Sequence, residues 1–361
     1  MNNIIESTPP VSLRNCFSKK RNSYNRKLQN VTLTLRGRDA IPLAIKHFEL
    51  KEQSIILLPA YLCKIIVVPF ANRFDLRYYD IEKDFSINTE VIESMLRSYD
   101  VKVLYIIHYF GFLHKNLEQL SKLCKEHGVL LWEDHAHSAL SHFSCDYADA
   151  MIFSYRKIFP VPDGGGIWFA NTQPMKISGG FLASNIISML IHIRRSKWAM
   201  SKKLRNRAGR IASLSTASTR EGFKQIKPRP ISYMSRRIMR CIDVESTFVI
   251  RRDIFLKWQS LLSDSEFKPV FSILPDNVCP QGFPVYIQNA EELIGKLRDF
   301  NIFLKVHWPL DAKMKEKCPV AYNVSRSIIT LPIYPGLSQS DMEQVMALLG
   351  RYGKPINPQM N

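Results

Sequence analysis

One short stretch of the chain gathers the residue types that carry covalent and acid–base chemistry. Two acids, Glu133 and Asp134, stand side by side at the end of an apolar run. Ser154 and Lys157 follow about twenty residues later in a Ser-x-x-Lys spacing, and a glycine triplet, Gly164 to Gly166, comes soon after. A carboxylate, a hydroxyl, an amine and a flexible turn in one stretch predict a site for an organic cofactor.

The set meets the chemical requirements of pyridoxal phosphate. This cofactor needs a lysine that holds its aldehyde and moves a proton, and a carboxylate that keeps its pyridine nitrogen protonated. Its phosphate needs a hydroxyl and backbone amides, and glycine lets the backbone come close. The sequence therefore predicts a pyridoxal phosphate site with Lys157, Ser154 and one of the two acids, Glu133 or Asp134, and without a metal ion.

The elements around these residues must bring them to one edge of a sheet. Strand-like runs alternate with helical patterns, which argues for a mostly parallel, doubly wound sheet. The acids end one strand and Ser154 ends another, and ligands bind outside the carboxyl ends of strands in such sheets. The predicted strands are Ile55–Leu58, Leu76–Asp80, Val103–Ile107, Val129–Trp132, Ala150–Ser154 and Gly166–Ala170.

At these residues the sequence resembles the DegT/DnrJ/EryC1/StrS family, the sugar aminotransferases of fold type I. The stretch from Glu133 to His137 is similar to the family's Glu-Asp-x-Ala-Gln, with His137 in place of the glutamine. The family's cofactor-bearing lysine and the serine before it map onto Lys157 and Ser154, although the family usually spaces them further apart. The resemblance covers roughly residues 30 to 170 and 230 to 348.

The resemblance assigns the residues around the cofactor ring. It favours Asp134 over Glu133 as the partner of the pyridine nitrogen, and strand alternation sends the two side chains to opposite faces. In the family, an aromatic residue often stacks on the cofactor ring. Its position falls near Cys63 here, so Tyr61 is expected to take this role. His137 either hydrogen-bonds the cofactor's phenolic oxygen or is a core histidine.

The resemblance also assigns the phosphate. Gly37, Arg38 and Asp39 are similar to the family's phosphate-cradling turn, where amides at a helix start attract anions. They could equally form an ordinary turn with Asp39 as the helix cap. The segment Ser232 to Ser235 corresponds loosely to one that reaches the partner subunit's cofactor phosphate in the family, and this implies a homodimer. His307 and Trp308 would close over the substrate.

Composition and cysteine usage fit an intracellular enzyme. The 361 residues are 46% hydrophobic and 23% charged, which argues against wholesale disorder. Seven cysteines are scattered without a Cys-x-x-Cys pair, as in a cytoplasmic protein with reduced thiols. The N-terminus lacks an apolar core of signal-peptide length, so export is not expected. Two histidines and a cysteine lie close together in the sequence, but their spacing matches no standard zinc site: His135, His142 and Cys145.

The formal net charge of +18 is concentrated in one segment. Between Arg194 and Arg240 there are fifteen lysines and arginines and one acid, Glu221, so this segment carries +14. It follows an apolar run, Phe181 to Ile193, that is shorter than the roughly 20 residues of a spanning helix. The pair of runs indicates either a solvated helical insertion or a helix on an anionic membrane face. No nucleic-acid-binding motif accompanies the charge.

These observations predict an α/β protein of fold type I with two domains. A large pyridoxal phosphate domain would span residues 30–245, with a basic helical insertion at 181–230, after an N-terminal extension at 1–29. One long helix starting at Ser235 would lead into a small C-terminal α+β domain at 246–361.

The predicted function is transfer of an amino group to a keto-sugar. The donor would be an amino acid, glutamate in the first instance, and the acceptor a nucleotide-linked sugar destined for a polysaccharide or glycoconjugate. The alternatives are an idle relative that serves as a membrane-surface scaffold, a sugar dehydratase of the same family, and an aminotransferase for a non-sugar substrate. Dehydratases of the family carry histidine at the lysine position, and Lys157 disfavours that alternative.

Overall fold

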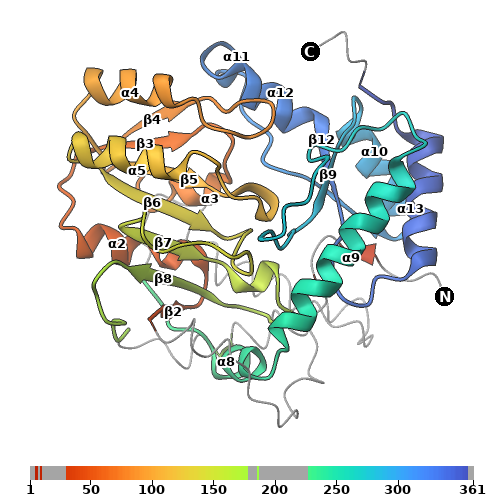
Figure 1. Ribbon diagram of the computed structural model, residues 1–361, viewed down its shortest axis with the longest axis horizontal. Coiled ribbons are helices and arrows are strands. Elements are labelled where there is room, and N and C mark those ends of the chain that lie inside the picture. The colour runs from red at the N-terminus through yellow and green to blue at the C-terminus, as the bar shows by residue number, and fades with distance from the viewer. Residues whose placement is uncertain (1–4, 7–8, 10–29, 178–184, 187–226, 357–361) are drawn as a thin grey trace.

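The structure is a computed structural model that describes residues 5–6, 9, 30–177, 185–186 and 227–356 (Figure 1). Most of the predicted insertion at 181–230, and with it the predicted membrane contact, lies outside the described residues. No helix in these ranges is both long enough and apolar enough to cross a membrane. The proposed domain boundaries stay a prediction.

A seven-stranded sheet forms the larger half of the molecule, in the order β2-β8-β7-β6-β5-β3-β4. The strands from β4 to β7 pair in parallel, and β8 runs antiparallel to both of its neighbours. This confirms the mostly parallel sheet. The strands are β2 (Thr32–Thr34), β3 (Ile55–Pro59), β4 (Asp75–Tyr79), β5 (Val101–Ile107), β6 (Leu130–His135), β7 (Ala150–Phe153) and β8 (Gly165–Phe169).

Helices cover both faces of this sheet. On one face, α4 (Thr89–Ser98) and α5 (Leu117–Glu126) pack their buried leucines and isoleucines on alternate residues of β3, β5 and β6. On the other, α2 (Ile41–His47) packs on the intervening residues. The strands β3 and β5 are apolar except for the exposed Lys102 of β5, because both of their faces are buried. Short turns complete this half: η2 (Gly37–Asp39), α3 (Lys64–Val67), η3 (Tyr109–Gly111) and η4 (Tyr155–Lys157).

Two helices lead from the large sheet to the smaller half, where one long helix was predicted. They are α8 (Tyr233–Arg240) and α9 (Val244–Leu262). The side chain of Asp243 accepts a hydrogen bond from the Ser246 amide and so starts α9 anew. The prediction of one continuous helix was wrong. α8 and the first turns of α9 pack on the large sheet, and the rest of α9 packs in the smaller half.

The smaller half is an antiparallel three-stranded sheet with helices. Its strands are β9 (Phe283–Tyr286), β11 (Lys305–Val306) and β12 (Ile328–Leu331), with β12 in the centre. A separate pair joins β10 (Ile302–Phe303) in parallel to β1 (Ile5–Glu6). The helices are α10 (Ala290–Leu297), η5 (Arg298–Phe300), α11 (Met314–Lys317), α12 (Pro319–Ser327) and α13 (Gln339–Tyr352), the last with a Ser338–Asp341 capping box.

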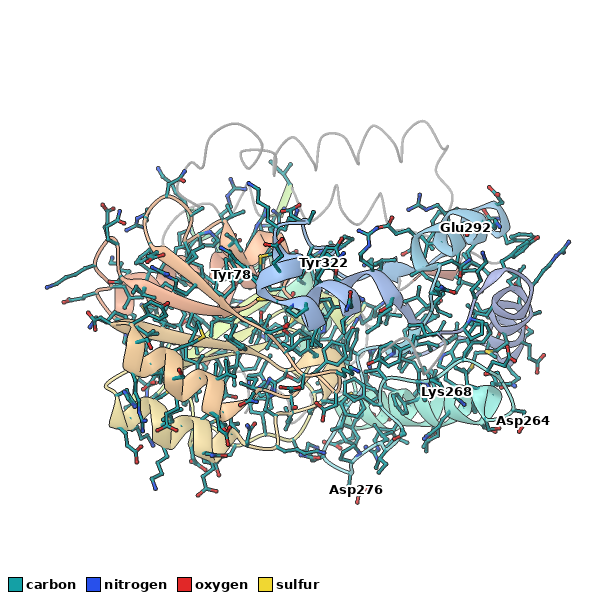
Figure 2. All side chains as sticks on the ribbon, turned by 90° about the horizontal axis from the view of Figure 1, so that it is seen from above. Tyr78, Asp264, Lys268, Asp276, Glu292 and Tyr322 are labelled. Carbon is teal, nitrogen blue, oxygen red and sulfur yellow. The ribbon has the colours of Figure 1, made fainter. Side chains whose placement is uncertain are left out.

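The two halves are tied together at α12. The carboxylate of Asp80, directly after β4, accepts the Val320 amide at 3.0 Å and the Ala321 amide at 2.8 Å. Figure 2, in which Tyr78 of β4 and Tyr322 of α12 are labelled, looks at this junction from above. The core cluster under α2 continues into Ala321, so the smaller half shares buried surface with the large sheet.

Candidate active site

The predicted site residues converge on one edge of the large sheet. Asp134 lies near the carboxyl end of β6, Ser154 directly follows β7, and Lys157 ends the 3-10 turn η4. Gly37 lies in the turn after β2, and a Cβ on it would stand only 3.0 Å from the Phe153 oxygen and 3.4 Å from the Ser154 Cβ. The arrangement of β2, β6 and β7 in one sheet therefore brings the turn at Gly37 against Ser154.

Asp134 is a buried carboxylate held by two hydrogen bonds. Tyr105 of β5 donates its hydroxyl to Oδ2 at 2.8 Å, and the Ala136 amide donates to Oδ1 at 2.7 Å. Burial raises the pKa of Asp134, while the positive charge of Lys157 and these two donors oppose the rise. The two donors and the Lys157 charge therefore favour the ionised form of Asp134. The sequence carried no signal for the role of Tyr105.

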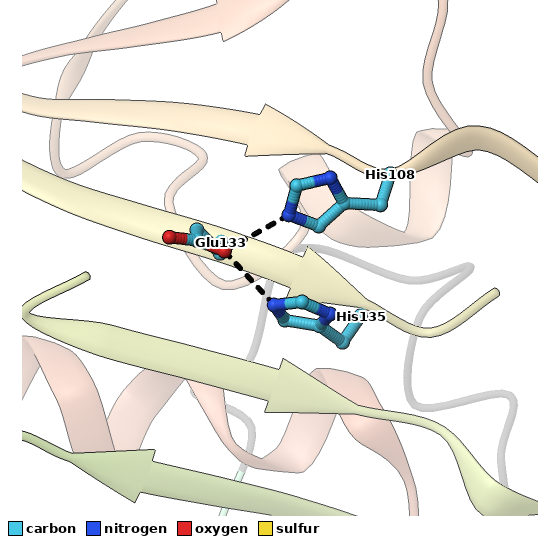
Figure 3. A group of neighbouring side chains, drawn as sticks. All are labelled: His108, Glu133 and His135. Atoms are coloured by element: carbon cyan, nitrogen blue, oxygen red, sulfur yellow. Dashed lines mark hydrogen bonds and ion pairs between the residues drawn. The ribbon is translucent and has the colours of Figure 1, made fainter. Parts of the chain in front are cut away.

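Glu133 points to the opposite face, as strand alternation predicted. Its Oε2 lies 2.9 Å from Nε2 of His108 and 2.9 Å from Nε2 of His135, and all three side chains are buried (Figure 3). The His114 amide donates to Nδ1 of His108, so Nε2 of His108 carries the proton that Glu133 accepts. Burial acts to raise the pKa of Glu133, but the histidine hydrogen bonds outweigh it and lower the pKa to about 2.

Among the described residues, His108, Glu133 and His135 form the one group whose donor atoms could hold a metal ion. The three donor atoms lie within 4.8 Å of one another. The histidine protons already occupy the space between these atoms, and Ser138 bonds the second nitrogen of His135 at 2.9 Å. Hydrogen bonds thus satisfy both rings without an ion. His142 stacks on Phe248 instead and does not join the group.

The charges of Lys157 and Asp134 act on each other inside the site. Burial lowers the pKa of Lys157, and the negative charge of Asp134 opposes that change. Its Nζ lies 5.9 Å from the centre of the Trp308 ring, which comes from the smaller half. A lysine with a lowered pKa is available as a nucleophile and as a proton carrier.

His137 is oriented by the backbone of the neighbouring strand's loop. The Phe110 amide donates to Nδ1 of His137 at 3.2 Å, so the neutral ring carries its proton on Nε2. Burial, followed by the nearby Lys157 and His307, lowers the pKa of His137 well below its ordinary value. His137 is therefore a neutral ring with one free donor, and it stacks on Trp308 at 5.4 Å.

Trp308 is the aromatic that connects the two halves at the site. Its ring lies 5.0 Å from Tyr61 and 5.3 Å from His307. Its backbone adopts a φ of 52°, which a bulky residue rarely does. Tyr61, predicted to face the cofactor ring, is fully buried among aromatic rings, and its hydroxyl has no hydrogen-bond partner within the described part of the chain.

The turn from Gly37 to Asp39 is not a capped helix start. α2 begins at Ile41, its N-cap is Ala40, and no side chain caps it. The alternative in which Asp39 caps the helix was therefore wrong. Asp39 is buried, and burial raises its pKa to about 6 against the opposing charges of Arg36, Arg38 and Arg229. Of these three arginines, only Arg38 was predicted from the sequence to lie at the site.

Comparison with known proteins gives a family match. The sequence model of the DegT/DnrJ/EryC1/StrS aminotransferase family matches residues 17–178. The matched residues, which include Asp134, Ser154 and Lys157, are similar to this family. Its members are pyridoxal phosphate-dependent aminotransferases, so the chain is an aminotransferase with pyridoxal 5'-phosphate as cofactor. A sequence comparison with curated proteins gave no match.

Solved structures show the same fold type I architecture at low sequence identity. The PLP form of Spr1654 from Streptococcus pneumoniae has a TM-score of 0.68 and 14% identity, and the match covers 96% of this chain and 97% of that one. PseC of Helicobacter pylori, an aminotransferase involved in the biosynthesis of pseudoaminic acid, has 0.65 and 12%, covering 97% and 99%. A family member from Brucella abortus has 0.65 and 16%, covering 90% and 86%.

The residues of this aminotransferase fit its cofactor. Asp134 supplies a buried carboxylate beside the amine of Lys157, as the pyridine nitrogen and the aldehyde require. The Tyr61 hydroxyl and Nε of Arg38 are buried polar atoms without a partner in the described ranges. Buried polar groups normally have partners, so these atoms indicate that the site is built to hold a polar ligand.

Proposed function

We propose that this aminotransferase moves an amino group from an amino acid, glutamate in the first instance, to a nucleotide-linked keto-sugar. The observation that carries the proposal is the juxtaposition of Lys157 and Asp134 at the carboxyl edge of the sheet. The keto-sugar is supported by a fold neighbour that acts in the biosynthesis of pseudoaminic acid. We propose that the product serves a polysaccharide or glycoconjugate.

In this proposal each residue has one task, while the cofactor supplies an electron sink and a carrier for nitrogen. Asp134 keeps the ring nitrogen protonated because its charge is stabilised by Tyr105 and the Ala136 amide. Lys157 would hold the cofactor through its amine and would serve as the group that carries a proton during the transfer. His137 donates from Nε2 to the phenolic oxygen, since its Nδ1 is occupied by the Phe110 amide.

The assignment of Lys157 is tested by labelling. Borohydride reduction of the loaded protein should fix the cofactor to Lys157, and peptide mapping locates the modified residue. A Lys157→Ala variant should give no label. A label on another lysine would overturn the assignment. Turnover tests with glutamate and a panel of keto-sugar nucleotides test the proposed reaction independently of the labelling.

The same purified, cofactor-loaded protein tests two alternatives, the idle scaffold and the dehydratase. A scaffold would lack the visible absorbance of bound cofactor, and a dehydratase would form product without consuming an amino donor. The homodimer and the membrane contact of residues 181–240 stay predictions. Light scattering and flotation with anionic and neutral liposomes test them.

A further inference from the structure

Four arginines surround the turn that packs on Ser154. Arg36 and Arg38 flank Gly37, and Arg156 lies between Ser154 and Lys157 in η4. Arg229 enters from a distant part of the chain, where its carbonyl accepts the Leu35 amide at 2.7 Å. Gly165 makes this convergence feasible, because a Cβ there would stand 2.2 Å from the Arg36 carbonyl carbon.

Within the described part of the chain, these guanidinium groups form no ion pair. Within the described ranges, no carboxylate lies within 4.0 Å of any of them and none makes a side-chain hydrogen bond. Nε of Arg38 is buried without a partner. Burial, followed by the charges of Arg38, Arg156 and Arg229, lowers the pKa of Arg36 to about 10, against the opposing charge of Asp39.

Unpaired positive charges that lie together in a partly buried site raise the free energy of the folded protein, and a bound anion would lower it. The protein atoms packed around the Arg156 guanidinium likewise lower its pKa by desolvation. Two buried carboxylates, Asp39 and Asp163, oppose these four positive charges. Arginine presents a fork of donors that matches a phosphate group.

We propose that Arg36, Arg38, Arg156 and Arg229 form a phosphate-binding cluster, supplied by one chain, that holds the phosphate of the cofactor beside Ser154. The proposal rests on the proposed function for the identity of the phosphate. A phosphate of the acceptor substrate has the same chemistry, and the two sources are separated by the experiment.

Two serines of the segment predicted to reach the partner's phosphate make hydrogen bonds within their own chain. The Ser232 hydroxyl donates to Oδ2 of Asp163 at 2.6 Å, and the Ser235 hydroxyl donates to the same oxygen at 2.7 Å. Both serines are buried. Their hydroxyls thus fix the start of α8 to the residue before the chain's own glycine turn.

The test compares pyridoxal phosphate with pyridoxal, which lacks the phosphate. Kd values are measured by absorbance for the wild type, Arg38→Gln, Arg156→Gln and the double variant. Loss of one charge-assisted contact should weaken pyridoxal phosphate about tenfold to a hundredfold and leave pyridoxal unchanged. Arg97 lies on the exposed face of α4, and Arg97→Gln is the matched control. It should change neither the Kd for pyridoxal phosphate nor the Kd for pyridoxal.

Two results overturn the cluster: unchanged affinity for pyridoxal phosphate, or an equal loss for both compounds. A second readout does not depend on the cofactor. Inorganic phosphate should raise the melting temperature of the cofactor-free wild type and have no effect on the double variant. If that holds while the wild type binds no pyridoxal phosphate, the cluster stands and the proposed function fails.

The source of the phosphate is decided on the loaded wild type. The cofactor should abolish the stabilisation by inorganic phosphate, because its own phosphate fills the cluster. If inorganic phosphate stabilises the loaded protein as much as the cofactor-free protein, the arginines serve the acceptor substrate and the assignment to the cofactor is overturned.

Discussion

Asp134 is the residue whose charge matters most to the chemistry. Asp134→Asn keeps the shape but removes the charge that holds the ring nitrogen protonated. We expect the half-reaction with an amino donor, followed through the cofactor's absorbance, to slow by several powers of ten, at ~1.4 kcal/mol per factor of ten. Glu133→Gln should affect stability instead, because Glu133 bonds His108 and His135 on the opposite face. The reverse pattern would mean that Glu133 is the ring's partner.

Asp39 gives a prediction for the dependence of stability on pH. Its pKa is about 6 in the folded protein against an ordinary 3.8, so the folded state binds the proton more tightly. The ionised carboxylate therefore costs nothing below about pH 4, and the cost grows with pH until it is complete above about pH 6, at roughly 3 kcal/mol.

Asp39→Asn should consequently stabilise the cofactor-free protein more at pH 7.5 than at pH 5, where roughly half of the gain remains. Urea unfolding at the two pH values measures the difference. The exposed Asp311→Asn, which only breaks a surface pair with Lys64, serves as the control. A gain that is the same at both pH values would contradict the origin in burial.

Single residues were predictable where they follow the ends of strands. Asp134 and Lys157 follow apolar strands at a spacing that the chemistry demands, and the structure brings them together. Arg229 and Tyr105 could not be found in this way. Arg229 lies far from Lys157 along the chain and Tyr105 lies inside a strand, so only the packing of the sheet shows what they face.

At the scale of elements, the glycine turn fixes how closely β2 and β8 approach. A Cβ on Gly165 would stand 2.3 Å from the Gly37 nitrogen and 2.6 Å from the Arg36 oxygen, which are backbone atoms that cannot rotate away. Gly165→Ala should cost about 3 kcal/mol or more of unfolding free energy and weaken cofactor binding, since it displaces the turn.

Gly295→Ala is the matched control for this substitution. Gly295 lies in α10 and is exposed, and a Cβ added there would meet no neighbouring atom within 4 Å. Alanine should therefore stabilise the helix by about 1 kcal/mol. Chemical denaturation of both variants measures the contrast. Equal stability of Gly165→Ala and the wild type would show that the turn yields more easily than the packing indicates.

The pattern of elements was predictable except where tertiary packing chooses between them. Each predicted strand of the large sheet exists, because alternating apolar runs and turns specify it locally. The break between α8 and α9 was not predictable, since the helical pattern continues through it. Ile238 and Met239 pack on the large sheet, while Phe255 and Trp258 pack in the smaller half.

At the scale of the whole molecule, the smaller half is linked to the site through backbone contacts. Arg251 of α9 donates to the Pro280 carbonyl at 2.9 Å and to the Gln281 carbonyl at 2.8 Å. The Gln281 amide in turn donates to the Phe110 carbonyl at 2.7 Å, and the Phe110 amide orients His137. The smaller half thus holds the loop that sets the proton position on His137.

Whether one chain supplies a complete site is the question that joins the arginine cluster to the predicted dimer. Arg156 is the residue before Lys157, so the proposed phosphate ligands and the cofactor lysine lie on the same chain. Hybrid dimers of a Lys157→Ala chain with an Arg38→Gln/Arg156→Gln chain should then contain no intact site. Each hybrid site lacks either the lysine or its arginines.

Co-expression with two affinity tags isolates the hybrid, and titration with pyridoxal phosphate gives the number of tight sites. We expect none, and we expect borohydride to label only the chain that retains Lys157, at the weakened affinity of the double variant. If the arginines acted across the interface, the Lys157→Ala chain would donate intact arginines to its partner's lysine. One tight site per dimer would follow, and that result would contradict a site supplied by one chain.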